Sequence, residues 1–553
     1  MNAAGDTALP AVDVLVVGMG PVGATIANLL GRYGVRTLVI DKATEIFTAP
    51  RAIALDNEAL RILQMAGLEE GAFDTVAIPG VHMRSPMFGE YARIRSAGQI
   101  DGHPKLVTFF QPQLEAVLRE RLAACPGVEA RTGVELLGFE TVSDGVNVRL
   151  RLGDGATARV HAHYLVGADG AASPVRQALG LKFGGRSFEQ DWLVVDAKRV
   201  PNPIADIEFL CDPARPCPHM VAPGDRQRWE FMLRPGETRE QMERPETVRR
   251  LLAPWAKVDE IEVERVAVYR FHARVAEAFS KGRVFLAGDA AHITPPFAGQ
   301  GLVAGMRDAA NLCWKLAWVV HGRAAPAILD SYDTERRSHA KSIINLALFM
   351  GKLVMPSNRV AAFVTHGLMT LMGFVPRLRR VFEELEIKPQ NKFGRGLFVA
   401  KGGGARLERG GLLPQGWVRS AADGRIVLSD EALATQLALV GFGVDPASAL
   451  DAALTARWQR AGGAMLRMMP RGLKASGATP TWEDLAGVFV PGLAPMGWIA
   501  IVRPDRTILV DGPAADASRL VREALALLGE FESKATSSVR SLQTDVKLNA
   551  PER

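Results

Sequence analysis

The first residues with chemical meaning are three glycines near the N-terminus, Gly18, Gly20 and Gly23. In a turn between a strand and a helix, the first glycine permits the tight bend, the second lets the backbone approach a pyrophosphate, and the third allows close packing. Free N–H groups at the helix N-terminus attract the anion. Asp41 ends the next apolar run, where an acid can accept hydrogen bonds from a ribose. The unit predicts dinucleotide binding; the alternative is a turn without a ligand and a solvated Asp41.

Two later apolar runs also end in a glycine and an aspartate. One ends at Asp169 and Gly170, and the other ends at Gly288 and Asp289. Each places a carboxylate at the carboxyl edge of a predicted strand, which is where ligands of open α/β sheets bind. Either run alone is more typical of an ordinary turn that ends a strand. Only together with the first turn do they indicate a shared ligand.

The three turns together resemble the signature of the FAD-dependent aromatic hydroxylases, the single-component flavoprotein monooxygenases. The resemblance covers residues 12–337 and implies that Asp289 meets the flavin ribitol. It also implies that residues 295–301 line the flavin ring and lead into a helix, whose N-terminus would stabilise the negative charge of the reduced ring. The residues for which it implies cofactor contacts are Gly18, Gly20, Gly23, Asp41, Arg51, Gln111, Asp169, Gly288, Asp289, Pro296, Gly299 and Gly301.

Within this family, the chain resembles the enzymes that hydroxylate 3-(3-hydroxyphenyl)propionate. The segments that carry this likeness include residues 50–53, 111–113, 211–213 and 305–309. The resemblance implies a stably held FAD, NADH or NADPH as a transient co-substrate, O2, and a small phenolic acid that becomes a 2,3-dihydroxy product. Open alternatives are hydroxylation of a resorcinol, a hydroxybenzoate or a polyketide-like aromatic, a flavin reductase without oxygen transfer, and a non-enzymatic FAD-binding protein.

Proton transfer from a phenol needs a titratable group beside the substrate. The segment 266–272 offers two such catalytic candidates, Tyr269 and His272, and His292 follows the flavin aspartate as a third. For each of them, the alternative is a packed structural residue. A substrate carboxylate would need a cation, and the candidates, whose alternative is a solvated surface position, are Arg186, Arg270 and Arg274.

The elements that must position these residues predict an α/β fold. Residues 12–17, 21–32 and 37–40 predict a βαβ unit, and residues 301–320 predict a long helix. The predicted domains are a Rossmann-like FAD-binding domain (1–183 and 276–345), an inserted antiparallel β-sheet substrate domain (184–275), a helical segment with a linker (346–400), and a C-terminal domain (401–553) that is thioredoxin-like by resemblance.

Composition argues against several other classes of protein. Of the 553 residues, 48% are hydrophobic and 23% are charged, and the net charge of +6 has no dense basic block, so no nucleic acid is expected as a partner. The apolar run at 360–375 is too short to span a membrane and predicts a buried or amphipathic helix, without a membrane role.

The cysteines bear on the compartment and on the C-terminal domain. The chain has four, with no C-x-x-C pair, which favours a reducing cytoplasm over a disulfide framework, and no metal site is predicted. A thioredoxin-like domain without C-x-x-C cannot exchange dithiols, so a structural or oligomerisation role is favoured. A homodimer is an expectation from the resemblance.

Overall fold

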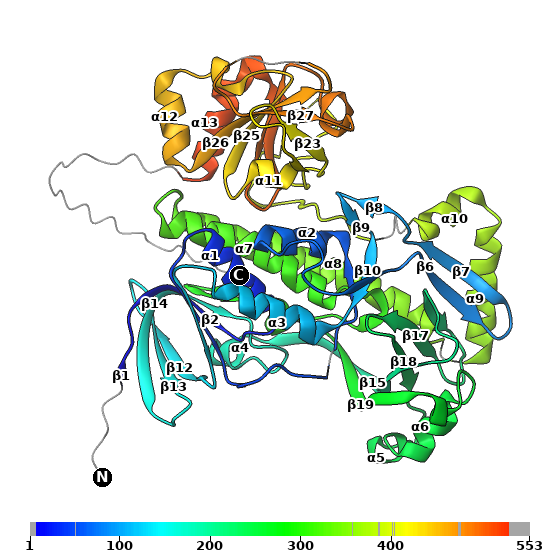
Figure 1. Cartoon of the computed structure of the whole chain (residues 1–553). Helices are drawn as coiled ribbons and strands as arrows, with labels where there is room; N and C mark the ends of the chain where they lie inside the picture. Colours follow the sequence, from blue (N-terminus) through cyan, green and yellow to red (C-terminus); the bar gives the residue numbers. More distant parts are fainter. Residues whose placement is uncertain are drawn as a thin grey trace, which may run out of the picture.

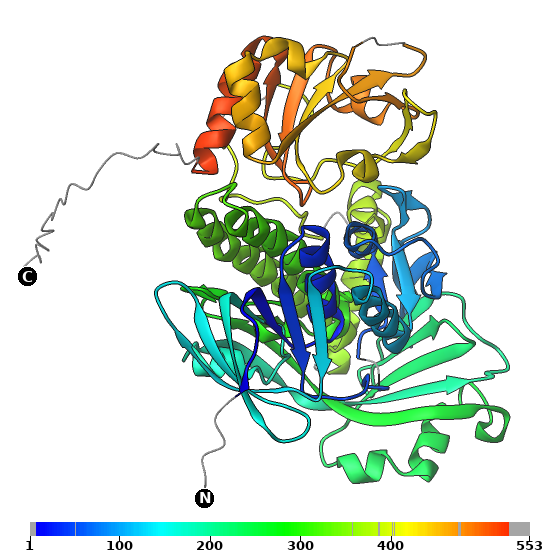
Figure 2. The ribbon, with the colours of Figure 1, turned by 60° about the vertical axis from the view of Figure 1, so that its left-hand side comes forward.

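The computed structural model describes residues 7–49, 51–356, 358–384, 388–400, 402, 404–473 and 477–529. Pro50, which precedes Arg51 in the predicted cofactor segment, lies outside the described residues, as do Gly403 of the predicted linker and the last part of the predicted C-terminal domain. Figures 1 and 2 show the C-terminal domain as a separate body that is stacked on the larger N-terminal part.

The predicted βαβ unit lies at the centre of a nine-stranded sheet. Strand β2 (Val12–Val17) pairs in parallel with β3 (Thr37–Asp41) and with β14 (Thr157–Gly167), and β14 pairs in parallel with β21 (Val284–Leu286). Because the carboxyl ends of parallel strands meet at one edge, the three glycine turns lie side by side there. The remaining strands of this sheet are β1 (Thr7–Ala8), β11 (Val128–Thr132), β12 (Glu135–Thr141), β13 (Val146–Arg151) and β20 (Ser280–Lys281).

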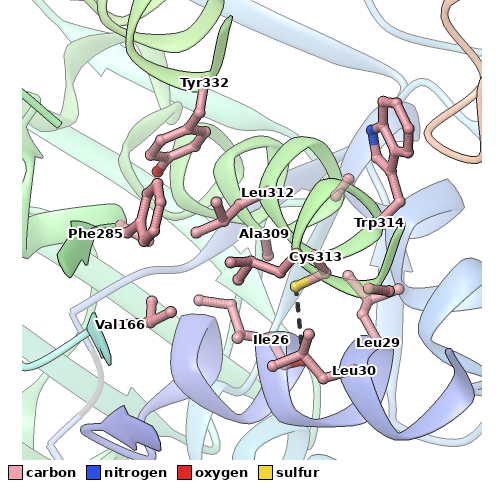
Figure 3. Packing of buried hydrophobic residues seen from close by; sticks show 14 of the residues in the cluster. Ile26, Leu29, Leu30, Val166, Phe285, Ala309, Leu312, Cys313, Trp314 and Tyr332 are labelled. Carbon is pink, nitrogen blue, oxygen red and sulfur yellow. Dashed lines mark hydrogen bonds between the residues drawn. The ribbon is translucent and has the colours of Figure 1, made fainter. Parts of the chain in front are cut away.

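Helices α1 (Pro21–Arg32) and α7 (Gly301–Val320) pack against each other beside this sheet, as Figure 3 shows. Their apolar side chains interlock, and the Cys313 thiol donates to the Ile26 carbonyl at 3.7 Å. Almost all of α7 is buried, so the start of this helix is fixed by a large hydrophobic core. Labelled members of this core are Ile26, Leu29, Leu30, Val166, Phe285, Ala309, Leu312, Cys313, Trp314 and Tyr332.

The second sheet has eight strands, in the order β22-β19-β15-β18-β17-β16-β6-β7. Its pairings are antiparallel, as predicted for this region, except that β16 pairs in parallel with β6. Strands β6 and β7 come from residues 80–95, far before the predicted substrate domain in the sequence, so a long-range pairing extends the sheet. The strands are β6 (Gly80–Ser85), β7 (Gly89–Arg95), β15 (Phe183–Lys198), β16 (Ile207–Leu210), β17 (Cys217–Ala222), β18 (Arg226–Met232), β19 (Glu262–Ala276) and β22 (His292–Ile293).

Smaller elements connect the two sheets, and three helices follow α7. The three helices are α8 (Asp330–Val354), α9 (Arg359–Gly373) and α10 (Pro376–Glu383). No helix among the residues that the structure describes is long and apolar enough to cross a membrane. The smaller elements are β4 (Ala54–Asp56), α2 (Asn57–Ala66), β5 (Thr75–Ala77), β8 (Gln99–Ile100), β9 (His103–Pro104), β10 (Leu106–Phe109), α3 (Gln111–Leu122), α4 (Pro174–Ala178), α5 (Arg239–Met242) and α6 (Pro245–Leu252).

The C-terminal domain contains a seven-stranded sheet, in the order β24-β23-β27-β26-β25-β28-β29. Strand β25 pairs in parallel with β26 and antiparallel with β28, so this sheet is mixed. Its elements are β23 (Trp417–Ser420), β24 (Ile426–Leu428), α11 (Ser429–Leu433), β25 (Leu437–Phe442), α12 (Ala452–Arg460), β26 (Gly463–Pro470), β27 (Thr481–Asp484), β28 (Trp498–Val502), β29 (Ile508–Pro513) and α13 (Ala517–Leu527).

Buried ion pairs join this domain to the rest of the chain. Arg61 of α2 lies 2.8 Å from the Asp430 carboxylate, and Glu335 of α8 lies 2.8 Å from the Arg503 guanidinium. Burial raises the pKa of Asp430, but the guanidinium groups of Arg61 and Arg506 outweigh burial and lower this pKa to about 2. Since an unpaired buried charge is costly, these pairs fix where the domain docks.

Candidate active site

A cavity of about 1430 Å³ lies between the carboxyl edge of the nine-stranded sheet and the eight-stranded sheet. Typical pockets for a single small ligand measure roughly 300–1,000 Å³, so this cavity has room for a dinucleotide and a substrate together. The predicted site residues that line it are Gly20, Asp41, Arg51, Gln111, Tyr269, His272, Asp289, Pro296, Gly299 and Gly301. The other predicted residues, Gly18, Gly23, Asp169 and Gly288, lie in the same turns but do not belong to this lining.

The first glycine turn has both tight and open positions. A Cβ atom on Gly23 would lie 1.9 Å from the Gly18 carbonyl oxygen, and one on Gly18 would lie 2.4 Å from the Ala168 carbonyl oxygen. Gly18 also has a φ of +97°, which side chains rarely adopt. A Cβ atom on Gly20 would meet nothing within 4 Å, although Gly20 lines the cavity. Packing therefore requires Gly18 and Gly23, whereas the open face of Gly20 fits the approach of a pyrophosphate.

Asp41 holds this turn in place as well as facing the cavity. Its carboxylate accepts hydrogen bonds from the Met19 N–H and the Ala43 N–H, both at 2.8 Å. Arg119 of α3 donates to the Met19 carbonyl at 3.1 Å and lies 3.9 Å from the Asp41 carboxylate. The sequence did not predict Arg119, yet the spacing of Gln111, Glu115 and Arg119, four residues apart on one helix face, could have indicated it.

Gln111 and Arg51, both predicted to contact the cofactor, meet in the structure. The Gln111 side-chain oxygen accepts hydrogen bonds from the backbone N–H groups of Arg51 and Ala52, each at 3.0 Å. These two bonds hold the Arg51 segment against the start of α3. Arg51 thereby stays at the cavity wall.

The turn after β21 is supported from behind by a buried charged group. The Asp308 carboxylate accepts from the Gly288 N–H at 3.1 Å and lies 2.7 Å from His292 Nε2. Burial raises the pKa of Asp308, but His292 and the Arg336 guanidinium outweigh burial, so the net shift is downward. His292 is only 1% exposed and lies outside the cavity lining, so its position fits the packed structural alternative.

Asp289, in front of this turn, is the carboxylate that faces the cavity. Burial raises its pKa, and the opposing effects of His292 and Arg51 only partly compensate. A desolvated carboxylate of this kind is a strong acceptor for ligand hydroxyl groups, such as those of a ribitol chain. This geometry fits the predicted role of Asp289.

Asp169, unlike Asp289, does not line the cavity. Its carboxylate accepts from the Ser173 hydroxyl at 2.5 Å and from the Val175 N–H at 3.0 Å, so it holds the first turn of α4 and its N-cap residue, Ser173. Burial raises the pKa of Asp169, and these hydrogen bonds oppose the shift. The residues of this turn that line the cavity are Ala168, Gly170 and Ala171, so the turn offers backbone there.

The segment before α7 forms the wall at the predicted flavin ring. Gly299 has a φ of +62°, and among the described residues no side chain caps the first turn of α7. The free N–H groups of this turn can therefore face a negatively charged ligand. Gln300 is held by Arg307, whose guanidinium donates to the Gln300 side-chain oxygen at 3.0 Å and to Asp56 at 2.9 Å.

The eight-stranded sheet supplies the opposite wall, with Tyr269 and His272 on β19. The Tyr269 hydroxyl accepts a hydrogen bond from Arg265, which also pairs with Asp196 at 3.2 Å. His272 Nδ1 lies 2.9 Å from the Ser187 hydroxyl. Burial lowers the pKa of His272, and nearby arginines lower it further, so the imidazole is neutral at pH 7.

Two further charged residues of this wall were missed by the sequence interpretation. Arg228 pairs with Asp196 at 2.6 Å, and the carboxyl of Glu230 is buried at the cavity. Burial raises the pKa of Glu230, and Arg228 only partly offsets this. Because alternate residues of a strand share one face, Arg228 and Glu230 could have been linked by their spacing alone.

The three arginines considered for a substrate carboxylate lie on β15 and β19. Arg270 lines the cavity and donates to Asp191 at 2.7 Å, and Arg274 donates to Ser187 at 2.8 Å. Arg186 lies over the Phe188 ring, 5.6 Å from its centroid. Only Arg270 of the three is part of the described cavity lining, where apolar walls fit an aromatic ring; these are Ile207, Phe209, Met220, Phe271, Phe297, Leu346 and Met350.

Comparisons with known proteins agree with this geometry. The family described as "FAD binding domain" matches residues 11–347, and the family described as "HcaD C-terminal domain" matches residues 410–527. A 3-(3-hydroxy-phenyl)propionate/3-hydroxycinnamic acid hydroxylase of Burkholderia vietnamiensis is 35% identical over 90% of this chain and 93% of its own. One of Klebsiella pneumoniae is 37% identical over 83% of each chain.

A solved structure of a hydroxylase has a similar fold. The OxyS anhydrotetracycline hydroxylase of Streptomyces rimosus is 25% identical, with a TM-score of 0.74 over 94% of this chain and 99% of that chain. The cavity, with its open Gly20, its desolvated Asp289 and the uncapped start of α7, fits FAD. The chain therefore belongs to the family of FAD-dependent aromatic hydroxylases and is an FAD-dependent monooxygenase.

Proposed function

We propose that the enzyme hydroxylates 3-(3-hydroxyphenyl)propionate, and 3-hydroxycinnamate, to the 2,3-dihydroxy products, with NADH or NADPH and O2 as co-substrates. The relatives that are 35% and 37% identical are named for these two substrates. The observation that carries the proposal is the single continuous cavity, which joins the glycine turn to the wall that bears Tyr269. A flavin and a small aromatic acid can meet in such a cavity away from water.

Under this proposal, backbone and side chains share the binding of FAD. Gly20 and Arg51 would hold the pyrophosphate, Asp41 the ribose, and Asp289 the ribitol, while Pro296, Gly299 and Gly301 would border the ring. Gly18, Gly23 and Gly288 would shape the turns, Gln111 would hold Arg51, and Asp169 would hold the backbone of its turn. Bound FAD supplies the activation of O2 for transfer to an electron-rich ring.

Under this proposal, His272 would accept the phenol proton, and Tyr269 would donate a hydrogen bond to the phenol oxygen. The Tyr269 oxygen already accepts from Arg265, so its own hydrogen is free to be donated to the substrate oxygen. His272, with its lowered pKa, is neutral at pH 7 and can accept a proton. Deprotonation makes the ring more electron-rich, and the apolar wall around it excludes water.

We also propose a thioredoxin-like C-terminal domain, within the predicted division of the chain at residues 183, 275, 345 and 400. A β25–α12–β26 unit followed by β28, β29 and α13, with the strand order β26-β25-β28-β29, supports the thioredoxin-like assignment. The four cysteines all lie before this domain, so it cannot exchange dithiols, and this supports a structural or oligomerisation role. The proposal includes a homodimer, which rests on the resemblance to the family. All four are free and buried, as expected of a cytoplasmic protein.

The test is NADH and NADPH oxidation by the FAD-loaded enzyme across a panel of phenols, with each product identified by mass. Faster oxidation with 3-(3-hydroxyphenyl)propionate and a product heavier by one oxygen atom is expected. If only a resorcinol, a hydroxybenzoate or a larger aromatic gains oxygen, the proposed substrate is wrong. If nicotinamide is oxidised and peroxide is the only product with every phenol, oxygen transfer itself is contradicted.

A further inference from the structure

The outward face of α9 and the start of α10 carry a concentration of exposed apolar side chains. Val360 is 73% exposed and Phe374 is 78% exposed, and six further large apolar residues near them are more than 40% exposed. Large apolar side chains gathered on one exposed face of a protein mark an interaction site. We call this set the outer row; it consists of Val360, Phe363, Val364, Leu368, Leu371, Phe374, Val375 and Leu378.

The exposure of the outer row follows from how α9 is packed. The opposite face of this helix is buried against β7 through Ala362, His366 and Met369, which lie at helical spacing. His366 stacks on Tyr91 of β7 with the ring centroids 4.2 Å apart. Because the inward face is already filled, α9 cannot turn its outer row inward. Figure 1 shows α9 and α10 at the outer edge of the molecule, beside β7.

The shape of the outer row suits another helix. Its members on α9 lie three, four, eight and eleven residues after Val360, which places them on one face of the helix, and the face continues through Phe374 and Val375 to Leu378 of α10. Residues 360–376 contain no charged side chain. A helix that lies on a lipid surface carries lysine or arginine along its flanks. Here arginines occur only at the two ends, at Arg359 and from Arg377 onward, where the rim of a protein interface would leave them in water.

We propose that the outer row is the contact surface for a second copy of this chain, with the two α9 helices antiparallel across a twofold axis. This inference gives a surface to the homodimer of the proposed function. An uncharged apolar stripe is complementary to itself when reversed, as a twofold interface requires. Eight such side chains can cover on the order of 800 Å², which is what each partner of a standard interface contributes.

The first test measures the mass of the full-length, FAD-loaded protein by size-exclusion chromatography with light scattering. The expected mass is twice the 59.7 kDa of the chain. The double variant Val364→Glu/Leu371→Glu should run at half that mass while it retains its flavin absorbance. The matched control is Ile426→Glu on β24, because Ile426 is 50% exposed and is therefore a large apolar residue at the surface, as Val364 and Leu371 are. This variant should remain dimeric. Wild-type protein of monomer mass, or a double variant that stays dimeric, overturns the proposal.

The second test locates the twofold axis with a Leu368→Cys variant, because Leu368 lies near the middle of the outer row. The four native cysteines are buried, so a short bis-maleimide should react at the new thiol alone. Cross-linked dimers are expected for Leu368→Cys and not for Ile426→Cys. Equal cross-linking of the two variants contradicts the interface. Wild-type monomers that float with anionic phospholipid vesicles, in contrast to the double variant, would assign the outer row to a lipid surface and overturn the proposal.

The two proposals fail separately. Product formation from 3-(3-hydroxyphenyl)propionate is measured on the same wild-type preparation as the mass. A dimer that hydroxylates none of the phenols keeps the interface and contradicts the substrate. A monomer that hydroxylates this phenol keeps the substrate and contradicts the interface.

Discussion

The two ends of the cavity are built by different means. The nucleotide end is shaped by backbone, because Gly18 and Gly23 leave no space for a Cβ atom and Gly20 leaves its face open. The substrate end is shaped by charged side chains of the eight-stranded sheet that hold one another, as Arg265 and Arg228 do around Asp196. Backbone turns of one kind suit one class of cofactor, whereas side chains can be exchanged without changing the fold. The nucleotide end therefore indicates the class of cofactor and the type of reaction, whereas the side chains of the substrate end determine which substrate fits.

The sharpest contrast lies within the glycine turn. Gly23→Ala places a Cβ atom 1.9 Å from the Gly18 carbonyl oxygen, and overpacking of this kind costs about 3 kcal/mol or more. We expect loss of bound FAD and of folded protein, measured by flavin absorbance and thermal unfolding. Gly20→Ala has open space, so its apoprotein should unfold at the wild-type temperature, while FAD should bind about tenfold more weakly or worse, a loss of about 1.4 kcal/mol of binding free energy. Equal behaviour of the two variants would contradict the division between packing and ligand contact.

At the substrate end, Tyr269→Phe should impair the reaction and spare the cofactor. General acid–base groups contribute a factor of at least about 100 to a rate, so product formation should fall about 100-fold with the FAD content unchanged. Rates of product formation and flavin absorbance, measured together, check this. The matched control is Tyr164→Phe, which removes a hydroxyl in the first sheet, outside the cavity lining. Equal losses for both variants would show that Tyr269 has only a packing role.

The eight-stranded sheet contains a buried histidine, His219, which should make the stability of the protein fall at acid pH. His219 stacks on Trp229 at 4.6 Å, and burial lowers its pKa to about 4 from the usual 6.5. Below pH 6.5, His219 takes up a proton in the unfolded chain but stays neutral in the folded protein. The free energy of unfolding therefore decreases as the pH falls from 6.5 towards 4. Between pH 7 and pH 5 this loss is about 2 kcal/mol. His219→Phe should remove this part of the decline in melting temperature; an unchanged pH profile would refute the assignment.

The smallest effect is expected for Arg270, whose ion pair with Asp191 is exposed. Arg270→Gln should leave the melting temperature unchanged, because exposed ion pairs contribute little. If Arg270 also contacts the substrate carboxylate, the KM should rise, by no more than about fivefold for so exposed a contact, while kcat stays constant. The matched comparison is Arg186→Gln, an exposed arginine of β15 that lies outside the cavity lining. An equal rise in KM for both variants would leave Arg270 without a specific role.

The nucleotide end could be predicted from the sequence because its signal is local. Each turn combines an apolar run with glycine and aspartate, and parallel pairing brings the three turns to one edge. The helix after Gly301 was likewise predicted from its own periodicity. Even here the sequence did not distinguish Asp289, which faces the cavity, from Asp169, which accepts hydrogen bonds from Ser173 and from the first turn of α4. Both follow strands, and only the packing around each decides where its carboxylate points.

The substrate end was harder to predict because its contacts join distant segments. Strands β6 and β7 enter the sheet through a pairing with β16, more than 100 residues away. The partner of His292 is Asp308 on the buried face of α7, and nothing in the local sequence shows that pair. Tyr269 and His272 were recognised by residue type, whereas their partners, Arg265 and Ser187, became visible only in the fold.

If flavin and phenol meet in one cavity, as we propose, oxygen from O2 reaches the ring. The most direct measurement supplies isotopically labelled O2 to the FAD-loaded enzyme with 3-(3-hydroxyphenyl)propionate and a nicotinamide, and determines the mass of the product. One labelled oxygen atom is expected in each dihydroxy product. A product without the label, or labelled peroxide with unchanged substrate, would contradict the proposal.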